Sequence, residues 1–372
     1  MNESLGHAEQ ERYSRHLLIP EIGETGQLRL KAASVLLIGS GALGSPAATY
    51  LAAAGVGRIA IVDPDVVELS NLHRQILHHD GWIGKPKVMS AAARLREINP
   101  HIRVETHAVR FTPENALDFA RGHDVIVDGS DNFPTRFLTN DTAFLLKIPL
   151  VYGAIHRFEG QVAVFAPHIG GPCYRCMLPA LPAAGSVPSC ADAGVLGVLP
   201  GVIGSLQAME TIKLILGIGE VPIGRITSYD GLRSSFRSIT LGKDPRCRLC
   251  GENPEITSVR NAETSASASC AIADTEISAS ELREILAAGF DGVLLDVREP
   301  QEHARANIDG ARLVPLGTLE NHLNEWPKEI PVIIHCKAGT RSARALEIMA
   351  AHGFTNLRHL KGGIDAWLAA DR

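Results

Sequence analysis

The chain has 372 residues, of which 45% are hydrophobic, and its formal net charge at pH 7 is −5. This length predicts two or three domains with packed cores. The mild acidity gives no reason to expect binding to nucleic acid or to an anionic membrane. The polar residues 1–10 lack the apolar core of a signal peptide, and no apolar run reaches the roughly 18 residues of a membrane span. We therefore expect a soluble cytoplasmic protein.

Residues 35–44 form the first strongly patterned stretch of the chain. The apolar run 35–38 predicts a buried parallel strand, and a helix is predicted over residues 45–54. Between them, the pattern G-x-G-x-x-G is matched by Gly39, Gly41 and Gly44. Such glycines let the backbone turn tightly and approach a phosphate, while the helix N-terminus offers free N–H groups. The stretch therefore predicts a site for a phosphorylated ligand.

A second apolar strand is predicted over residues 58–62, and it ends at Asp63. This acid lies about 20 residues after the last glycine, the distance at which a carboxylate reaches the ribose of a bound nucleotide. Strand, glycine turn, helix, strand and acid together favour nucleotide binding over a purely structural βαβ unit. They do not distinguish NAD, FAD and ATP.

Basic side chains lie before and after this unit. Residues 11–33 predict one or two helices, and we expect Arg15 and its basic neighbours to form a solvated helix face. A polar segment follows the second strand, at the sheet edge where open α/β sheets bind ligands. There Asn71 can hydrogen-bond a phosphate oxygen, and Arg74 can also neutralise its charge. Lys87 lies at the start of another predicted helix, where a lone lysine is usually an ordinary surface residue. Together with Asn71 and Arg74, it favours a polyphosphate site.

A second acidic site follows a buried strand predicted over residues 123–128. Asp128 and Asp131 could hold Mg²⁺ together with nucleotide phosphates, because Mg²⁺ prefers one or two carboxylates plus phosphate oxygens. The alternative is that Asp131 and Asn132 cap the next helix. The two interpretations are compatible.

The seven cysteines include two C-x-x-C pairs, Cys173 with Cys176 and Cys247 with Cys250. In a chain without a signal peptide, this favours metal binding or thiol chemistry over disulfides. Two such pairs supply the four thiolates of a tetrahedral zinc site, and full thiolate ligation leaves no open position. We therefore expect structural Zn²⁺. Separate redox-active C-x-x-C motifs are the alternative.

Cys190 lies between the two pairs. It follows the Pro-, Ala- and Gly-rich segment 178–189, which predicts a mobile loop. A mostly apolar run over 194–216 comes next, and Pro200 suits the first turn of a buried helix there. Cys190 is either an inert buried thiol or a nucleophile whose pKa is lowered near that helix. The sequence leaves both open.

A flexible linker is predicted over residues 253–274, because its Ala/Ser-rich part lacks large apolar residues. A second, smaller α/β domain is predicted over residues 275–372. It contains a predicted helix over 280–288 and buried strands over 293–297 and 331–335.

The strand over 331–335 runs into Cys336, and a helix is predicted from Ser342. A thiolate between a strand and a helix N-terminus is stabilised when successive loop N–H groups point inward, and Lys337 and Arg341 add positive charge. The loop suits a persulfide carrier or a cysteine phosphatase. Four residues separate Cys336 from Arg341, one fewer than in the phosphatase pattern.

Together these motifs resemble two known families joined in one chain. Residues 1–252 are similar to the MoeB/ThiF adenylyltransferases, relatives of ubiquitin-activating enzymes, which implies a Rossmann-like ATP-binding fold with a zinc knuckle. Residues 275–372 resemble a rhodanese domain. The order is similar to that of the fused adenylyltransferase/sulfurtransferases of molybdopterin synthesis and tRNA thiolation. The resemblance rests on Arg12-Tyr-Ser-Arg15, the glycine turn, Asp63, Ser70-Asn-Leu-His-Arg74, Lys87, Asp131-Asn132, both C-x-x-C pairs, Leu295-Asp-Val-Arg-Glu-Pro300, the Cys336 loop and Lys361-Gly-Gly-Ile-Asp-Ala-Trp367.

The resemblance implies that ATP binds at the glycine turn, where the family usually has Gly at the position of Ala42. It implies that Asp63 holds the ribose and that Asp131 holds Mg²⁺. The implied nucleotide-binding residues are Gly39, Gly41, Ala42, Gly44, Asp63, Ser70, Asn71, Leu72, His73, Arg74, Lys87, Asp131 and Asn132. The implied catalytic residues are Arg15, Arg74, Lys87, Asp131, Cys190 and Cys336.

The implied substrate is a small ubiquitin-like sulfur carrier protein ending in Gly-Gly, whose carboxylate is adenylated by ATP. Cys336, loaded as a persulfide by a donor such as a cysteine desulfurase, then attacks the acyl-adenylate, and a carrier thiocarboxylate forms. In relatives an arginine matching Arg15 enters the partner subunit's active site, which implies a homodimer. Cys190 matches a thiol proposed in fused relatives to form an acyl or disulfide link.

Two other classes of protein stay open. The glycine turn permits an NAD- or FAD-dependent oxidoreductase fused to a rhodanese domain, although Arg74, Lys87 and Asp131 suit ATP with Mg²⁺ better than a dinucleotide. A non-catalytic scaffold that binds a ubiquitin-like partner is the other alternative. The acids and Cys336 argue against that scaffold.

Overall fold

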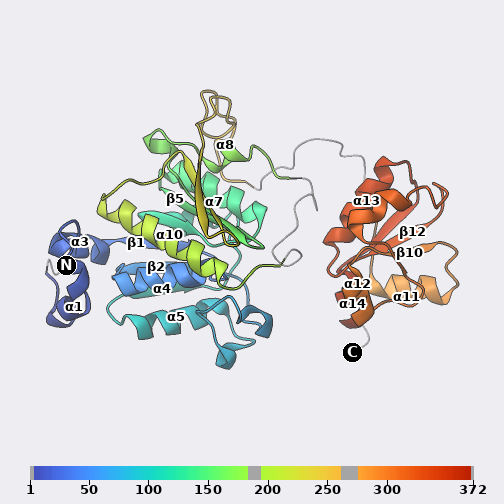
Figure 1. The fold of residues 1–372 in the computed structure, drawn as a ribbon, viewed down its shortest axis with the longest axis horizontal. Coiled ribbons are helices and arrows are strands. Elements are labelled where there is room, and N and C mark those ends of the chain that lie inside the picture. Colours follow the sequence, from blue (N-terminus) through green and yellow to red (C-terminus); the bar gives the residue numbers. More distant parts are fainter. Residues whose placement is uncertain (1–3, 183–193, 261–274, 370–372) are drawn as a thin grey trace. The chain divides into compact units, whose positions relative to one another are not determined.

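The computed structural model describes residues 4–182, 194–260 and 275–369. These residues form two compact units, drawn in Figure 1. The first contains residues 4–181 and 194–260, and the second contains residues 275–369. Both have mixed α/β folds, as the sequence predicts.

The first unit is built on an eight-stranded sheet in the order β3-β2-β1-β4-β5-β6-β7-β8. The strands are β1 Ser34–Ile38, β2 Arg58–Val62, β3 Arg103–His107, β4 Val125–Asp128, β5 Leu150–His156, β6 Glu159–Phe165, β7 Arg225–Asp230 and β8 Ser235–Thr240. The strands from β3 to β5 pair in parallel, and β6, β7 and β8 add antiparallel hairpins at one side. The parallel part is therefore the doubly wound, Rossmann-like half of the sheet.

Helices cover both faces of the parallel strands. They are α1 His7–Arg12, α2 Ser14–Leu17, α3 Gly23–Ala32, α4 Gly44–Ala54, α5 Lys87–Ile98, α6 Ala116–Ala120, α7 Phe133–Leu146, α8 Tyr174–Met177 and α10 Leu199–Leu216. Two helices, α2 and α3, lie within residues 11–33, which confirms the prediction of one or two helices there, and α1 ends at Arg12.

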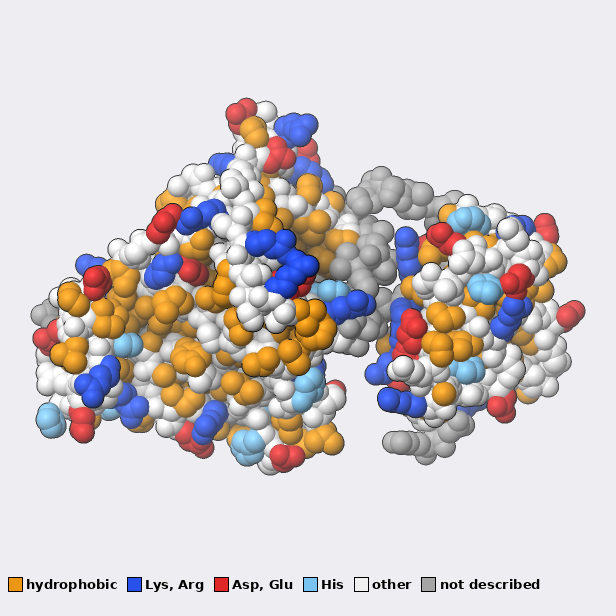
Figure 2. Space-filling model, in the orientation of Figure 1, with side chains coloured by type: hydrophobic (Ala, Val, Ile, Leu, Met, Phe, Trp, Pro, Cys, Tyr) orange, Lys and Arg blue, Asp and Glu red, His pale blue; other side chains and the backbone are white. Residues whose placement is uncertain are grey.

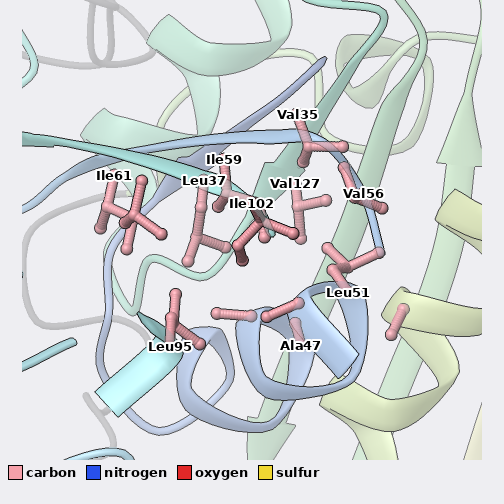
Figure 3. Packing of buried hydrophobic residues seen from close by; sticks show 14 of the residues in the cluster. Val35, Leu37, Ala47, Leu51, Val56, Ile59, Ile61, Leu95, Ile102 and Val127 are labelled. Carbon is pink, nitrogen blue, oxygen red and sulfur yellow. The ribbon is translucent and has the colours of Figure 1, made fainter. Parts of the chain in front are cut away.

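Alternate residues of each central strand enter different cores. Val35 and Leu37 of β1 pack with α4 and α5 in one cluster, while Leu36 and Ile38 pack in the other with α6 and α7. Figure 3 shows the first cluster, with Leu51 and Leu95 facing the strands. Because both faces are covered, the strands read as continuous apolar runs rather than as alternating patterns.

Helix α10 is long and apolar enough to cross a membrane by length and composition alone. The expectation that no apolar segment reaches that length is therefore wrong for this helix. Half of it is buried inside the unit, where it packs on α4, β5 and β6. The approach to α4 is close: a Cβ on Gly204 would lie 2.4 Å from Pro46. These are the contacts of a core helix.

The glycine turn between β1 and α4 is packed against its own backbone. Gly39 has φ 87°, and a Cβ on Gly44 would lie 2.0 Å from the Gly39 carbonyl oxygen. Gly129, just after β4, presses on the same carbonyl, with a built Cβ 2.7 Å away. At Gly41 the nearest atom to a built Cβ is 3.6 Å away, on the Gln75 side chain. A larger residue at Gly39 or Gly44 would thus strain or displace backbone, whereas a methyl group on Gly41 would make an ordinary van der Waals contact.

Gly44→Ala is therefore expected to destabilise the first unit by about 1–3 kcal/mol or more, because the new methyl group must displace backbone. Gly41→Ala is the matched control and should leave the unfolding free energy within about 0.5 kcal/mol of wild type. Urea unfolding of both variants measures the difference. Equal stability of the two would contradict the packing described here.

The second unit is a five-stranded parallel sheet in the order β11-β10-β12-β13-β9, with helices on both faces. The strands are β9 Glu276–Ile277, β10 Val293–Asp296, β11 Arg312–Leu313, β12 Val332–His335 and β13 Leu357–Leu360. The helices are α11 Ala279–Ala287, α12 Pro300–Arg305, α13 Thr340–Ala351 and α14 Gly363–Ala369. The loop that carries Cys336 leaves the central strand β12.

Candidate functional site

A cleft opens at the carboxyl ends of β1, β2 and β4 in the first unit. Strand β1 pairs with both β2 and β4, so the strand order reverses here, at the point where open α/β sheets bind ligands. The predicted site residues that line this cleft are Gly39, Gly41, Ala42, Asp63, Arg74, Lys87, Asp131 and Asn132. Gly44 lies beneath it, as the first residue of α4.

Asp63 is buried and joins the glycine turn to the end of β2. Its Oδ2 accepts hydrogen bonds from the Ser40 N–H at 2.7 Å and the Ser40 hydroxyl at 3.0 Å. Its Oδ1 accepts one from the Asp65 N–H at 2.9 Å. The carboxylate thus shapes the turn and also borders the cleft where a ribose would lie.

The two predicted phosphate-binding cations both border the cleft. The Lys87 ammonium is almost buried, with 8% of its side chain exposed, and it lies 3.0 Å from an oxygen of the exposed Asp65. Arg74 donates to the Ser70 carbonyl at 2.7 Å and lies 2.8 Å from the His73 ring. A buried ammonium costs free energy unless an anion is paired with it. Asp65 is that partner here, and an anionic ligand in the cleft could share Lys87 with it.

The other residues of the 70–74 segment lie outside the lining of the cleft. Asn71 is buried, and its Oδ1 accepts a hydrogen bond from the Glu68 N–H at 3.1 Å. Its backbone carbonyl accepts from the Arg74 N–H at 3.0 Å. Asn71 therefore holds the turn that places Arg74. The predicted nucleotide contacts of Ser70, Asn71, Leu72 and His73 stay predictions.

The acids after β4 occupy different environments. Asp131 is exposed at the cleft, whereas Asp128 is fully buried outside its lining, and burial raises the pKa of Asp128. Asn132 caps α7, because its Oδ1 accepts from the Thr135 N–H at 2.9 Å. Of the two acids considered for Mg²⁺, only Asp131 reaches the cleft, and the capping interpretation holds for Asn132.

Sequence reasoning missed Arg136. This largely buried cation lines the cleft from the first turn of α7. Its guanidinium lies 5.8 Å from the Phe133 ring centroid and 5.4 Å from that of Tyr152, and it donates to the Ser130 carbonyl at 3.2 Å. Its place in the first turn of a helix capped by Asn132 can be read from the sequence, but its approach to the cleft depends on where α7 lies. Arg110, Gln75 and Asp65 also line the cleft.

The four cysteines of the C-x-x-C pairs come together. All four Sγ atoms lie within 4.8 Å of one another, and three of their separations are 3.4, 3.6 and 3.9 Å. Zn–S bonds of about 2.3 Å in a tetrahedron place sulfurs about 3.8 Å apart, so the cluster fits Zn²⁺. The Asp244 N–H also lies 3.4 Å from the Cys176 sulfur.

The cysteine cluster is tied to helix α7 by a buried ion pair. Arg175, between the first two cysteines, forms two hydrogen bonds with Asp141, at 2.8 and 2.7 Å. Their side chains are only 5% and 0% exposed. On the other side Ile256 is buried against the cluster, and its N–H donates to the Arg248 carbonyl at 2.9 Å. The predicted flexible linker therefore begins later than residue 253, because at least Ile256 is packed.

We predict that the purified chain holds about one zinc ion at the four cysteines. Cys250→Ser should lower the zinc content measured by elemental analysis and lower the unfolding temperature of the first unit by about 5–10 °C. Cys270→Ser, outside the described residues and without a predicted role, is the control. Unchanged zinc content in Cys250→Ser would contradict this metal site.

Two further predicted residues are not placed in a site. Cys190 lies outside the described residues. Arg15 is exposed on α2, and its predicted entry into a partner subunit's active site stays a prediction.

In the second unit, Cys336 is buried at the end of β12, with 1% exposed surface. The Gly339 N–H donates to its sulfur at 3.1 Å. The N–H groups of Ile364 and Asp365, at the start of α14, donate to the carbonyls of Cys336 and Lys337. Backbone hydrogen bonds from the start of α14 thus clamp the loop that carries the sulfur.

The Gly362-Gly363 pair at the start of α14 makes this close approach of backbone to the loop sterically possible. A Cβ on Gly363 would lie 2.3 Å from the Lys337 carbonyl oxygen. The positive charge of the Cys336 loop is also partly balanced, because Arg341 makes two 2.7 Å hydrogen bonds to the Glu302 carboxylate. Lys337 is exposed.

Comparisons with known proteins match both units. The ThiF family profile matches residues 13–249, and the Rhodanese-like domain profile matches residues 278–370. A Mycobacterium tuberculosis protein named probable adenylyltransferase/sulfurtransferase MoeZ is 45% identical over 98% of this chain and 94% of its own length. The adenylyltransferase and sulfurtransferase MOCS3 of Anopheles gambiae is 42% identical, covering 98% of this chain and 87% of that protein.

Two other matches cover mainly the first unit. The sulfur carrier protein adenylyltransferase of Thermus thermophilus is 53% identical over 66% of this chain and 92% of that protein. The crystal structure of E. coli MccB with ATP has a TM-score of 0.57 at 22% identity, covering 66% of this chain and 76% of that chain, which shows a shared fold.

The cleft, the cysteine cluster and the Cys336 loop thus belong to an enzyme of the adenylyltransferase and sulfurtransferase class. The chain is a member of the ThiF family that carries a C-terminal rhodanese-like domain.

Proposed function

We propose that this enzyme uses ATP to adenylate the C-terminal Gly-Gly carboxylate of a ubiquitin-like sulfur carrier protein and then converts it to a thiocarboxylate. The observation that carries the proposal is one chain with two sites: a cleft lined by Lys87, Arg74, Arg136 and Asp131, and a buried cysteine in a clamped loop. The name of the Thermus relative, a sulfur carrier protein adenylyltransferase, supports the substrate class.

Adenylation needs charge stabilisation rather than covalent help from the protein. The carrier carboxylate attacks the α-phosphorus, a phosphoanhydride bond breaks, and pyrophosphate leaves with the electron pair. Lys87, Arg74 and Arg136 line the cleft where this negative charge shifts. Asp131 would hold Mg²⁺, which neutralises phosphate charge when bound. In this proposal Asp63, which is hydrogen-bonded to Ser40 of the turn, binds the ribose.

Sulfur transfer then uses the second site. The outer sulfur of a Cys336 persulfide attacks the carbonyl carbon of the acyl-adenylate, and AMP leaves with the electron pair of the broken C–O bond. A thiolate next attacks the Cys336 sulfur of the acyl persulfide, which releases the thiocarboxylate and leaves a mixed disulfide. We propose Cys190 or an external thiol for that attack, and a cysteine desulfurase as the persulfide donor.

We also propose a cytoplasmic homodimer. Figure 2 shows hydrophobic side chains on the face that carries α4 and α10, and Tyr50 and Met209 of these helices are 56% and 55% exposed. Exposed apolar side chains gathered on one face are typical of a protein interface. A monomeric mass in solution would contradict this part of the proposal.

The adenylation step predicts carrier-dependent exchange of pyrophosphate into ATP. Asp131→Asn should reduce the exchange rate by at least about 100-fold, because it removes the carboxylate at the cleft while keeping its size. Asp118→Asn, an exposed acid on α6 outside the cleft lining, is the matched control. Cys336→Ala should leave exchange unchanged.

Exchange that proceeds without any carrier, or that survives Asp131→Asn, would contradict the proposal. An absorbance spectrum of the purified chain with a bound flavin or nicotinamide would instead favour the oxidoreductase alternative.

A further inference from the structure

A row of buried polar side chains lies behind Cys336, and the sulfur-transfer steps above do not use it. Ser342, on the first turn of α13, is fully buried, and its hydroxyl lies 3.6 Å from the Cys336 sulfur. His359 of β13 is 8% exposed, and its Nδ1 lies 3.5 Å from the same hydroxyl. Cys336 directly follows β12, Ser342 lies on α13 and His359 lies on β13, so the fold rather than local sequence brings them together.

The single hydroxyl hydrogen of Ser342 has two possible acceptors, so the hydrogen bonds of this row can be arranged in two ways. A serine hydroxyl has one hydrogen to donate, and it lies 2.9 Å from the Gly339 carbonyl and 3.6 Å from the sulfur. When Cys336 is a thiol, the hydroxyl donates to Gly339. When Cys336 is a thiolate, the hydroxyl can rotate to donate to the sulfur, because a charged acceptor forms the stronger hydrogen bond.

His359 fits the second arrangement. With its hydrogen on Nδ1, the ring donates to the Ser342 oxygen and leaves the hydroxyl hydrogen directed at the sulfur. Burial lowers the pKa of His359, which keeps the ring neutral, while nearby Glu276 acts in the opposite direction. Nε2 of the ring lies 4.0 Å from the Glu276 carboxylate, which is itself paired with Lys361 at 2.9 Å.

The charged side chains around the loop are paired with other groups or exposed, so they do not take the place of the Ser342 hydrogen bond to the sulfur. Arg341 is held by Glu302, and Lys337 is exposed. His335, on β12 next to Cys336, lies 3.9 Å from Asp296, which is paired with Arg298 and His303. Within the described residues, the uncharged donors within hydrogen-bonding distance of the sulfur are the Gly339 N–H and the Ser342 hydroxyl.

We propose that Ser342 is a positioning residue that donates a hydrogen bond to the Cys336 sulfur in its thiolate form, and that His359 orients the Ser342 hydroxyl. The thiolate is needed when Cys336 is loaded. It attacks the outer sulfur of a persulfide, the S–S bond breaks, and its electron pair goes to the donor's sulfur. Only the identity of that donor rests on the proposed function.

The test is the pH dependence of iodoacetamide alkylation at Cys336, followed by mass spectrometry of its peptide in the full-length chain. Ser342→Ala should raise the midpoint of the alkylation profile by about one pH unit, because a hydrogen bond to a charged group is lost. His359→Gln should raise it by less. Thr340→Ala, which removes an exposed hydroxyl from the same loop, should leave it unchanged.

An unchanged midpoint in Ser342→Ala overturns the proposal. If circular dichroism shows that this variant does not fold, His359→Gln decides: a raised midpoint supports the proposal, and an unchanged one overturns it. The assay needs no ATP, carrier or donor. Failure of carrier adenylation and failure of this inference are therefore distinguishable.

Discussion

The contact between two pieces of backbone, at Gly39 and Gly44, determines the geometry of the first unit. Helix α4 can begin next to β1 because Gly44 has no side chain, and Gly129 brings the end of β4 against the same Gly39 carbonyl. Asp63 then fixes the turn through Ser40. The end of β1 is thus held within hydrogen-bonding distance of the ends of β2 and β4, which lie on either side of it. The cleft is a consequence of that close approach, and the cations around it only give it specificity.

The second unit also depends on a close approach of backbone at a glycine, although its site has different chemistry. There Gly363 lets the start of α14 press on the Cys336 loop from one side, and backbone N–H groups hold the loop carbonyls. In both units glycine backbone fixes a loop after a parallel strand. Cations in both sites are already paired with carboxylates: Lys87 with Asp65, and Arg341 with Glu302. An anionic ligand must share or displace those partners, which favours ligands that bring several negative charges.

Much of this could be predicted from sequence where the signal is local. Continuous apolar runs predicted the central strands, the glycine pattern predicted the turn, and the spacing of the cysteine pairs predicted their cluster. The role of Asp128 was not local, because its burial depends on packing that only the folded sheet provides. Arg136 was missed for a similar reason, since its approach to the cleft depends on where α7 lies. Ile256 shows the limit of prediction from composition: it lies within the predicted linker 253–274 but packs against the cysteine cluster.

The central claim is that both sites act on one carrier molecule, and intact mass spectrometry of the carrier tests it most directly. A Gly-Gly-ended carrier from the same cell would be incubated with the full chain, ATP, Mg²⁺ and a persulfide donor. The account predicts that the carrier mass rises by the difference between sulfur and oxygen, and that this product is lost with either Asp131→Asn or Cys336→Ala. A carrier that gains sulfur with Cys336→Ala, or that never gains sulfur with the wild-type chain, would contradict the account.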